Sequence, residues 1–203
     1  MTPDITPELV LTAYARGAFP MADPDSGEIS LFACAPRCVM PLEPGGLRVS
    51  QTLGRRARSG RFRIAFDRAF DAVVGECAGE RSTENRSWIS EELRTLYGEL
   101  HRRGHAHSVE AWLGDVLVGG LYGVALKGAF FGESMFSRPQ LGGTDASKVC
   151  LMALVARLRS RGFTLLDCQY SNPHMHSLGA VEIPVEEYLA RLERALALTD
   201  ARF

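Results

Sequence analysis

Polar side chains follow two apolar segments in a pattern that suits acid–base chemistry. Glu133 comes directly after the apolar run 129–132, and Asp167 and Gln169 follow the run 163–166. If both runs are strands of one α/β sheet, their ends meet at the edge where ligands of such sheets bind. A carboxylate in that place must be solvated, paired or functional. We therefore expect Asp167, Gln169 and Glu133 to converge on one site.

The five cysteines suit reduced thiols rather than a disulfide framework, because they are odd in number and lie mostly among apolar residues. Cys34 and Cys38 have a spacing that could suggest zinc, but no second pair of ligands follows. Cys168 alternates with Asp167 along its strand, so if Asp167 faces a cleft, Cys168 faces the core. We therefore predict a structural thiol at Cys168 rather than a nucleophile.

Two His-x-His pairs, His105/His107 and His174/His176, also raise the question of a metal. Neither pair has a set of carboxylates and histidines nearby that would complete a site. The sequence therefore predicts no metal site. His105 and His107 are interpreted as polar residues at the start of a strand.

The elements that must position these residues alternate between helices and strands. The expected helices cover 7–16, 67–77, 90–103, 146–161 and 186–198, and the first, third and fourth are capped by Thr6, Ser90 and Asp145. The expected strands cover 61–66, 108–113, 116–126, 129–134 and 163–168, with turns at Gly114-Asp115 and Lys127-Gly128.

Pro44-Gly45-Gly46 marks the expected boundary between a small amino-terminal lobe, residues 1–46, and a main domain, residues 47–203. Within the main domain, helices are followed by an antiparallel meander, a long capped helix and a buried strand. That order is typical of the acetyltransferase-like GNAT fold, an α/β architecture with a mixed sheet.

The segment before the long helix tests whether the chain binds coenzyme A. GNAT acetyltransferases place a Q/R-x-x-G-x-G/A loop there, whose backbone amides hold the pyrophosphate. Here the segment reads Gln140-Leu-Gly-Gly-Thr-Asp145, so its last position carries an anion where the pyrophosphate would lie. Coenzyme A binding is therefore disfavoured, although a coenzyme A-dependent N-acyltransferase stays as the alternative function.

Composition and charge limit the other function classes. The chain has 203 residues, 46% of them apolar, and a net charge of -1, which argues against a basic nucleic-acid coat. It contains no long apolar run and no visible signal peptide, so we expect a cytoplasmic protein without a membrane span. Residues 48–68 nevertheless hold seven arginines against Asp67 alone. Such a cluster is either a solvated face or a contact for phosphates, and its centre consists of Arg55, Arg56, Arg58, Arg61 and Arg63.

Eight short segments together resemble the bacterial leucyl/phenylalanyl-tRNA–protein transferases, and they occur in the family's order from about residue 6 to 192. The segments are Ala13-Tyr-Ala-Arg-Gly-Ala-Phe-Pro20, Ser87-Trp-Ile-Ser90, His105-Ala-His-Ser-Val-Glu110, Val118-Gly-Gly-Leu-Tyr-Gly-Val124, Gly132-Glu-Ser-Met-Phe-Ser137, Asp145-Ala-Ser-Lys148, Leu166-Asp-Cys-Gln169 and Ser177-Leu-Gly-Ala-Val-Glu-Ile-Pro184.

This resemblance implies transfer of Leu, Phe or Met from aminoacyl-tRNA to proteins that begin with Arg or Lys, which creates a degradation signal. It implies no metal and no coenzyme A, a GNAT-like domain after a small lobe, and a monomer. The implied catalytic residues are Asp167 and Gln169. The implied substrate-binding residues are Glu133, Met135, Leu121, Trp88, Tyr97 and Asn172. From the charge of the segment itself, we predict that Arg55, Arg56, Arg58, Arg61 and Arg63 bind the tRNA backbone.

The transfer is aminolysis of an activated ester, so it needs orientation and an acceptor for one proton. Our hypothesis gives the proton to Asp167, the orientation of the amine or ester to Gln169, and the attraction of a cationic acceptor to Glu133. Two departures from the family concern the donor. Leu31-Phe32 replaces a Trp-Trp pair, so Phe32 is expected to stack on the adenosine, and the loop 138–145 is longer than usual. The changed pair also keeps open a non-catalytic RNA- or protein-binding module.

Overall fold

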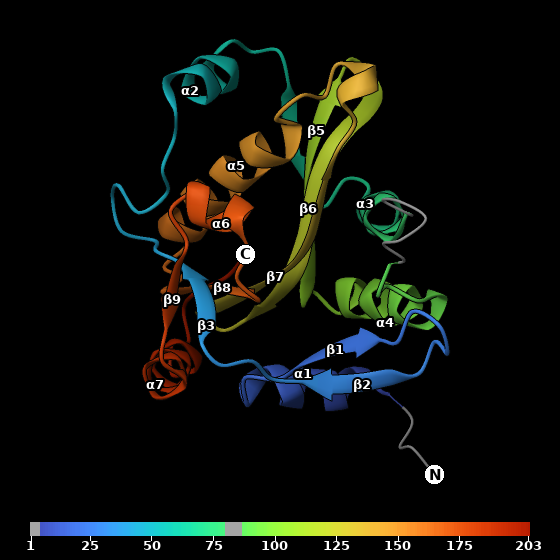
Figure 1. The fold of residues 1–203 in the computed structure, drawn as a ribbon, viewed down its shortest axis with the longest axis vertical. Helices are drawn as coiled ribbons and strands as arrows, with labels where there is room; N and C mark the ends of the chain where they lie inside the picture. Colours follow the sequence, from blue (N-terminus) through green and yellow to red (C-terminus); the bar gives the residue numbers. More distant parts are fainter. Residues whose placement is uncertain (1–4, 80–86) are drawn as a thin grey trace.

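A sheet of seven strands forms the centre of the computed structural model, which describes residues 5–79 and 87–203 (Figure 1). The strand order is β4 (Arg63–Phe66), β5 (Ala106–Leu113), β6 (Val116–Leu126), β7 (Ala129–Ser137), β8 (Leu165–Gln169), β3 (Arg37–Met40) and β9 (Val181–Ile183). β7 and β8 are parallel, and the other neighbouring strands are antiparallel. The expected α/β class with a mixed sheet is confirmed.

The meander β5–β6–β7 turns where the sequence predicts. Gly114-Asp115 joins β5 to β6 and Lys127-Gly128 joins β6 to β7. Gly114 and Lys127 have φ values of 60° and 56°, the left-handed backbone that tight hairpin turns require. β6 has the predicted bounds, whereas β7 continues past the predicted end at Ser134.

β7 and β8 pair over a short stretch and then separate. Residues 129–131 of β7 align with residues 165–167 of β8. Beyond that stretch β7 continues to Ser137 beside β6, while β8 ends at Gln169. A gap therefore opens in the sheet where Glu133 and Gln169 lie, and we call it the wedge.

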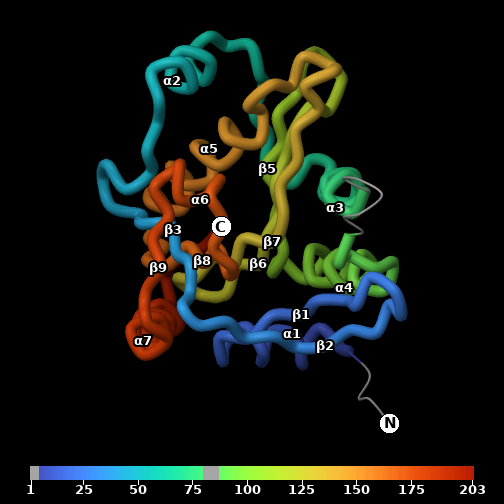
Figure 2. Tube along the Cα trace, viewed as in Figure 1, coloured from blue at the N-terminus to red at the C-terminus, as the bar shows by residue number. Residues whose placement is uncertain are grey.

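Helices cover both faces of the sheet (Figures 1 and 2). One apolar cluster joins the sheet to α1 (Pro7–Ala15), α3 (Phe70–Ala78), α4 (Glu91–Arg102) and α7 (Val185–Leu196). A second cluster on the opposite face joins it to α2 (Gln51–Arg58), α5 (Ala146–Ser160) and α6 (Pro173–Ser177). Thr6 and Ser90 cap α1 and α4 as predicted, because each hydroxyl accepts a backbone N–H at 3.2 Å.

Asp145 does not cap α5, contrary to the prediction. It has a φ of 63°, which turns its carboxylate away from the N–H groups of the helix. The carboxylate instead pairs with Arg56 and, at 2.9 Å, with Nζ of Lys148. The Asp67 carboxylate likewise bonds His107 and the backbone of Ser108, so α3 starts later than predicted. α2, α6 and β9 were not predicted.

β3 connects the amino-terminal lobe with the main sheet. The lobe consists of α1 and a hairpin of β1 (Phe19–Ala22) and β2 (Ile29–Phe32), which lies below the large sheet in Figure 1. β3 follows this hairpin and pairs with both β8 and β9. Residues 37–40 therefore belong to the main sheet, although they precede the predicted boundary at residue 46.

Candidate active site

A cavity of about 480 Å³ lies at the wedge. The cavity is lined by five of the residues that the family resemblance assigns to substrate binding, namely Trp88, Leu121, Glu133, Met135 and Asn172. The structure thus brings together residues from β6, β7, the segment before α4 and the segment before α6.

The floor of the cavity is apolar and comes largely from residues that sequence reasoning did not assign. α5 contributes Leu151 and Leu154, β8 contributes Leu166, and α6 contributes Met175. Ser134, Tyr122, Cys168 and His174 complete the lining with Gly132. An apolar floor beside one carboxylate suits a ligand with an apolar side chain next to a reacting polar group. The apolar residues of α5 indicate that the helix is buried but not which of its residues face a cavity.

Glu133 is the carboxylate at the wedge, and three side chains hold it. The hydroxyl of Tyr14 donates to Oε1 at 2.7 Å, that of Tyr97 donates to Oε2 at 2.9 Å, and Nε2 of Gln169 donates to Oε1 at 2.8 Å. Burial raises the pKa of Glu133 to about 7, although both tyrosine hydroxyls act to lower it. Glu133 therefore changes charge near neutral pH.

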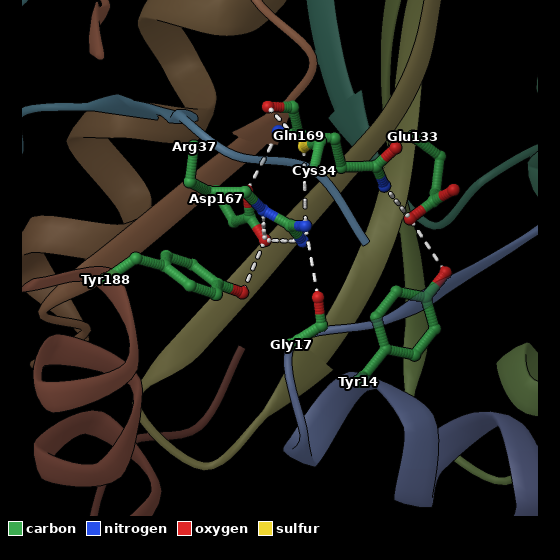
Figure 3. A network of polar contacts seen from close by, with 8 residues as sticks. All are labelled: Tyr14, Gly17, Cys34, Arg37, Glu133, Asp167, Gln169 and Tyr188. Atoms are coloured by element: carbon green, nitrogen blue, oxygen red, sulfur yellow. Dashed lines mark hydrogen bonds and ion pairs between the residues drawn. The ribbon is translucent and has the colours of Figure 1, made fainter. Parts of the chain in front are cut away.

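Asp167 does not line the cavity, and its side chain lies between those of Arg37 and Tyr188 (Figure 3). Its side chain is 0% exposed. It pairs with Arg37 at 2.6 Å, and it accepts hydrogen bonds at 2.8 Å from both the Tyr188 hydroxyl and the Gln169 N–H. The predicted orientation is therefore reversed, because Cys168 faces the cavity and Asp167 the interior. Arg37 supplies the charge that makes burial of this carboxylate tolerable.

Gln169 links the buried pair to the wedge. Its backbone has a φ of 60°, which is uncommon for a residue with a side chain. Its N–H donates to Asp167 while its side-chain amide donates to Glu133. The predicted convergence of Asp167, Gln169 and Glu133 is thus present as a connected series of hydrogen bonds (Figure 3).

Two of the proposed substrate residues do not line the cavity. Tyr97 is 0% exposed and reaches the site only through Glu133. Phe32 lies on β2, is 39% exposed, and faces a separate hollow with Met21 and Glu28. Their roles in donor binding remain predictions.

Three residues of the site were missed, namely Tyr14, Arg37 and Tyr188. Tyr14 lies within one of the segments that carry the family resemblance, and Arg37 lies five residues after Phe32. Their polar groups meet the site only through contacts between residues far apart in sequence. Tyr188 lies 21 residues after Asp167, beyond α6 and β9, and no local pattern marks it.

The predicted tRNA-binding arginines lie on α2, in the segment that follows it and at the start of β4. Arg55, Arg58, Arg61 and Arg63 are exposed, whereas Arg56 is half-buried against Asp145. Arg61 also donates to the carbonyl of Gly142 at 3.0 Å. The patch thus borders the loop that precedes α5.

The loop before α5 uses its amides internally. The N–H groups of Leu141, Gly142 and Gly143 donate to carbonyls of the same loop, and that of Ala146 donates to Gly143. The N–H of Ser147 donates to the Ser137 hydroxyl. A pyrophosphate would have to displace these acceptors as well as the Asp145 carboxylate, so the loop does not fit coenzyme A.

The cysteine and histidine motifs have local partners. The Cys34 thiol donates to the carbonyl of Gln169 at 3.4 Å. His107 pairs with Asp67, and His176 contacts the Ser171 hydroxyl at 2.7 Å. Within residues 5–79 and 87–203 the side chains form no group of three ligands suited to a metal ion. No helix in that part of the chain is long and apolar enough to cross a membrane.

Family models and sequence relatives agree on one family. A family model described as leucyl/phenylalanyl-tRNA protein transferase matches residues 39–193, and one described as its N-terminal domain matches residues 3–34. A protein of Rubrobacter xylanophilus named leucyl/phenylalanyl-tRNA–protein transferase is 52% identical over 97% of this chain and 98% of its own length. A protein of the same name from Gluconobacter oxydans is 52% identical over 96% of this chain and 84% of its own length.

A solved structure of the acetyltransferase AAC(6')-Iy with a bisubstrate analog is also similar, at 13% identity and a TM-score of 0.38, over 70% of this chain and 93% of that one. The family match covers most of the chain, and the two relatives extend over nearly all of it. The chain belongs to the leucyl/phenylalanyl-tRNA–protein transferase family.

Proposed function

We propose that this protein transfers leucine or phenylalanine, and also methionine, from aminoacyl-tRNA to the amino terminus of an acceptor protein. The observation that carries the proposal is the largely apolar cavity that Glu133 lines, in a chain that belongs to this family. The cavity binds the apolar side chain of the donor amino acid, and the ester that links this amino acid to the tRNA then lies next to Glu133. No coenzyme is required, because the ester is already activated.

The chemistry at the wedge is aminolysis. The acceptor's α-amine attacks the ester carbonyl, an N–C bond forms, and the bond from that carbon to the ribose oxygen breaks. The attacking nitrogen loses one proton and the ribose oxygen gains one. A group that titrates near neutral pH suits both proton transfers.

Glu133 is the better placed proton acceptor. Its pKa of about 7 matches the task, and it lines the cavity. Asp167, to which the sequence hypothesis gave the proton, is enclosed by Arg37, Tyr188 and the Gln169 N–H. We therefore assign Asp167 to positioning, and Gln169 to orienting Glu133 and the reacting groups.

The remaining substrate assignments follow the family resemblance. An ionised Glu133 favours a cationic acceptor, so we propose amino-terminal Arg or Lys. Trp88 lies on the cavity wall and is assigned to the terminal adenosine of the donor, as base stacking on an aromatic contributes roughly 1–3 kcal/mol. The exposed arginines of α2 and residues 61 and 63 bind the tRNA backbone without reading its sequence. The product would carry a new amino-terminal Leu or Phe as a degradation signal, in the cytoplasm, from a monomeric enzyme.

The test is transfer of labelled leucine or phenylalanine from charged tRNA to a peptide that begins with Arg, without coenzyme A. We expect transfer, and we expect it to vanish when the peptide terminus is acetylated. Absence of transfer with charged tRNA still bound would contradict the proposal and favour a binding module. Transfer that requires an acyl-coenzyme A would instead favour the N-acyltransferase alternative.

A further inference from the structure

Arg37 is a buried cation that contacts several parts of the site (Figure 3). Its side chain is 1% exposed. Nε lies 2.9 and 3.1 Å from the two oxygens of Asp167, and Nη2 lies 2.6 Å from one of them. Nη1 donates to the carbonyl of Gly17 at 3.0 Å, and the guanidinium lies 4.8 Å from the Phe19 ring and 4.6 Å from the Tyr188 ring. Arg37 thus has fixed partners on every side.

Stability alone does not account for this arrangement. A buried ion pair loses much of its hydration, and apolar residues of similar volume often give an equally stable protein. A planar guanidinium that binds a carboxylate through two nitrogens does fix the orientation of that carboxylate. Arg37 therefore serves to fix the orientation of the Asp167 carboxylate.

Asp167 transmits this geometry to Gln169. Oδ1 of Asp167, which lies 2.9 Å from Nε of Arg37, also accepts the Gln169 N–H at 2.8 Å. Gln169 has a left-handed backbone with a φ of 60°, a conformation that carries strain and needs support from its surroundings. That conformation directs the side-chain amide to Glu133 at 2.8 Å.

We propose that Arg37 is a positioning residue for the transfer reaction: it fixes Asp167, which holds the left-handed backbone of Gln169 and so places the amide that orients Glu133. The inference rests on the proposed function, because it assigns the reaction to the wedge. It adds that β3, which precedes the predicted domain boundary in sequence, sets the geometry of the reacting group.

The charges of the pair give a second, independent consequence. Asp167 acts to raise the pKa of Glu133, and Arg37 acts to lower it. Removal of Arg37 alone leaves the Asp167 charge uncompensated, so the pKa of Glu133 rises. Removal of both charges restores the balance, and the pKa of Glu133 returns towards its value in the unchanged protein.

The experiment compares three variants: Arg37→Met, the double variant Arg37→Met/Asp167→Asn, and the control Arg191→Met. Arg191 forms an exposed pair with Glu187 on α7, so its loss removes a cation from the same helix that carries Tyr188. Each variant is measured for thermal unfolding, for kcat and KM of transfer, and for the Glu133 titration by carboxyl carbon NMR. The double variant avoids the uncompensated buried charge that could unfold Arg37→Met.

We expect the double variant to unfold near the temperature of the unchanged protein, with a kcat about 10–100-fold lower and an unchanged donor KM, because a misplacement of about 1 Å can cost that much. We expect its Glu133 titration to be restored, whereas that of Arg37→Met moves to higher pH. Recovery of kcat together with stability in the double variant would overturn the proposal and leave Arg37 a purely structural residue. An unchanged kcat in a folded Arg37→Met would also overturn it.

Failure of the proposed function has a different signature. In that case the unchanged protein and Arg191→Met show no transfer at all, while the NMR titration of Glu133 still reports whether Arg37 controls this carboxyl. The two failures are therefore distinguishable.

Discussion

Replacing Tyr14 by phenylalanine removes one hydroxyl that donates to Glu133 and keeps the ring. The hydroxyl lies 2.7 Å from Oε1 of Glu133, and the ring packs on Phe131 with centroids 4.8 Å apart. A hydrogen bond to a charged group contributes about 1.5–3 kcal/mol, which corresponds to about one to two pH units in a titration midpoint. The bond favours the charged form, so its loss moves the Glu133 titration upward by that amount.

The expected effect on rate follows from the ionised fraction. With a pKa of about 7, about half of Glu133 is ionised at pH 7 in the unchanged protein. In Tyr14→Phe that fraction falls to roughly 1–10%, so kcat/KM at pH 7 falls roughly 5–50-fold and recovers towards pH 9. The assay is transfer of labelled leucine to one Arg-initiated peptide from pH 6 to 9, so that the titration of the peptide amine is the same for every variant.

Tyr97→Phe is the matched comparison, because its hydroxyl donates to the other carboxylate oxygen at 2.9 Å. We expect the same direction of change in its pH profile. Arg191→Met should leave the profile unchanged. A loss of rate in Tyr14→Phe that is equal at every pH would refute the reasoning, since it would mean that Glu133 does not have to be ionised for transfer.

Three further predictions concern stability, tRNA binding and donor selectivity. Glu133→Gln should stabilise the fold by roughly 2–3 kcal/mol more at pH 8 than at pH 4.5. The pKa of Glu133 is raised from 4.5 to about 7 in the folded protein, so its protonated form contributes stability at low pH that is lost as the pH rises through 7. Equal changes in the free energy of urea unfolding at both pH values would contradict this. Arg55→Ala and Arg58→Ala, at exposed positions of α2, should each weaken tRNA binding and reduce its slope against log salt by roughly 0.7–0.9; unchanged slopes would reject the patch. Leu151→Phe narrows the cavity floor, so kcat/KM for phenylalanyl donors should fall roughly tenfold relative to leucyl donors, and an unchanged ratio would place the donor elsewhere.

The sequence predicted the edge of the sheet where the site lies, because polar residues directly follow two apolar runs there. Glu133 ends an apolar run, and the alternation of meander and helix predicts which strand ends come together. The meander and the long helix that flank these strand ends are long and strongly patterned, which is the case in which periodicity is most informative.

The enclosure of Asp167 could not be predicted in this way. Alternation along a strand says that Asp167 and Cys168 face opposite sides, but not which side holds the cavity. That choice depends on Arg37, whose position in the sequence gives no sign of its pairing with Asp167. Asp145 was misassigned for a similar reason, because its partner Arg56 lies on a helix that the sequence analysis did not predict.

The insertion of β3 between β8 and β9 has a consequence for the order in which the protein matures. β3 spans Arg37–Met40, yet both of its hydrogen-bonded neighbours lie beyond residue 164. During synthesis from the amino terminus, β3 leaves the ribosome long before either neighbour exists, and contacts between such distant segments form slowly. The buried pair of Arg37 and Asp167 can close only after residue 167 has been synthesised and has left the ribosome. A chain whose synthesis has not reached β8 can therefore form the meander but not the ordered wedge. The proposed transferase would accordingly not be active on charged tRNA before β8 has joined the sheet.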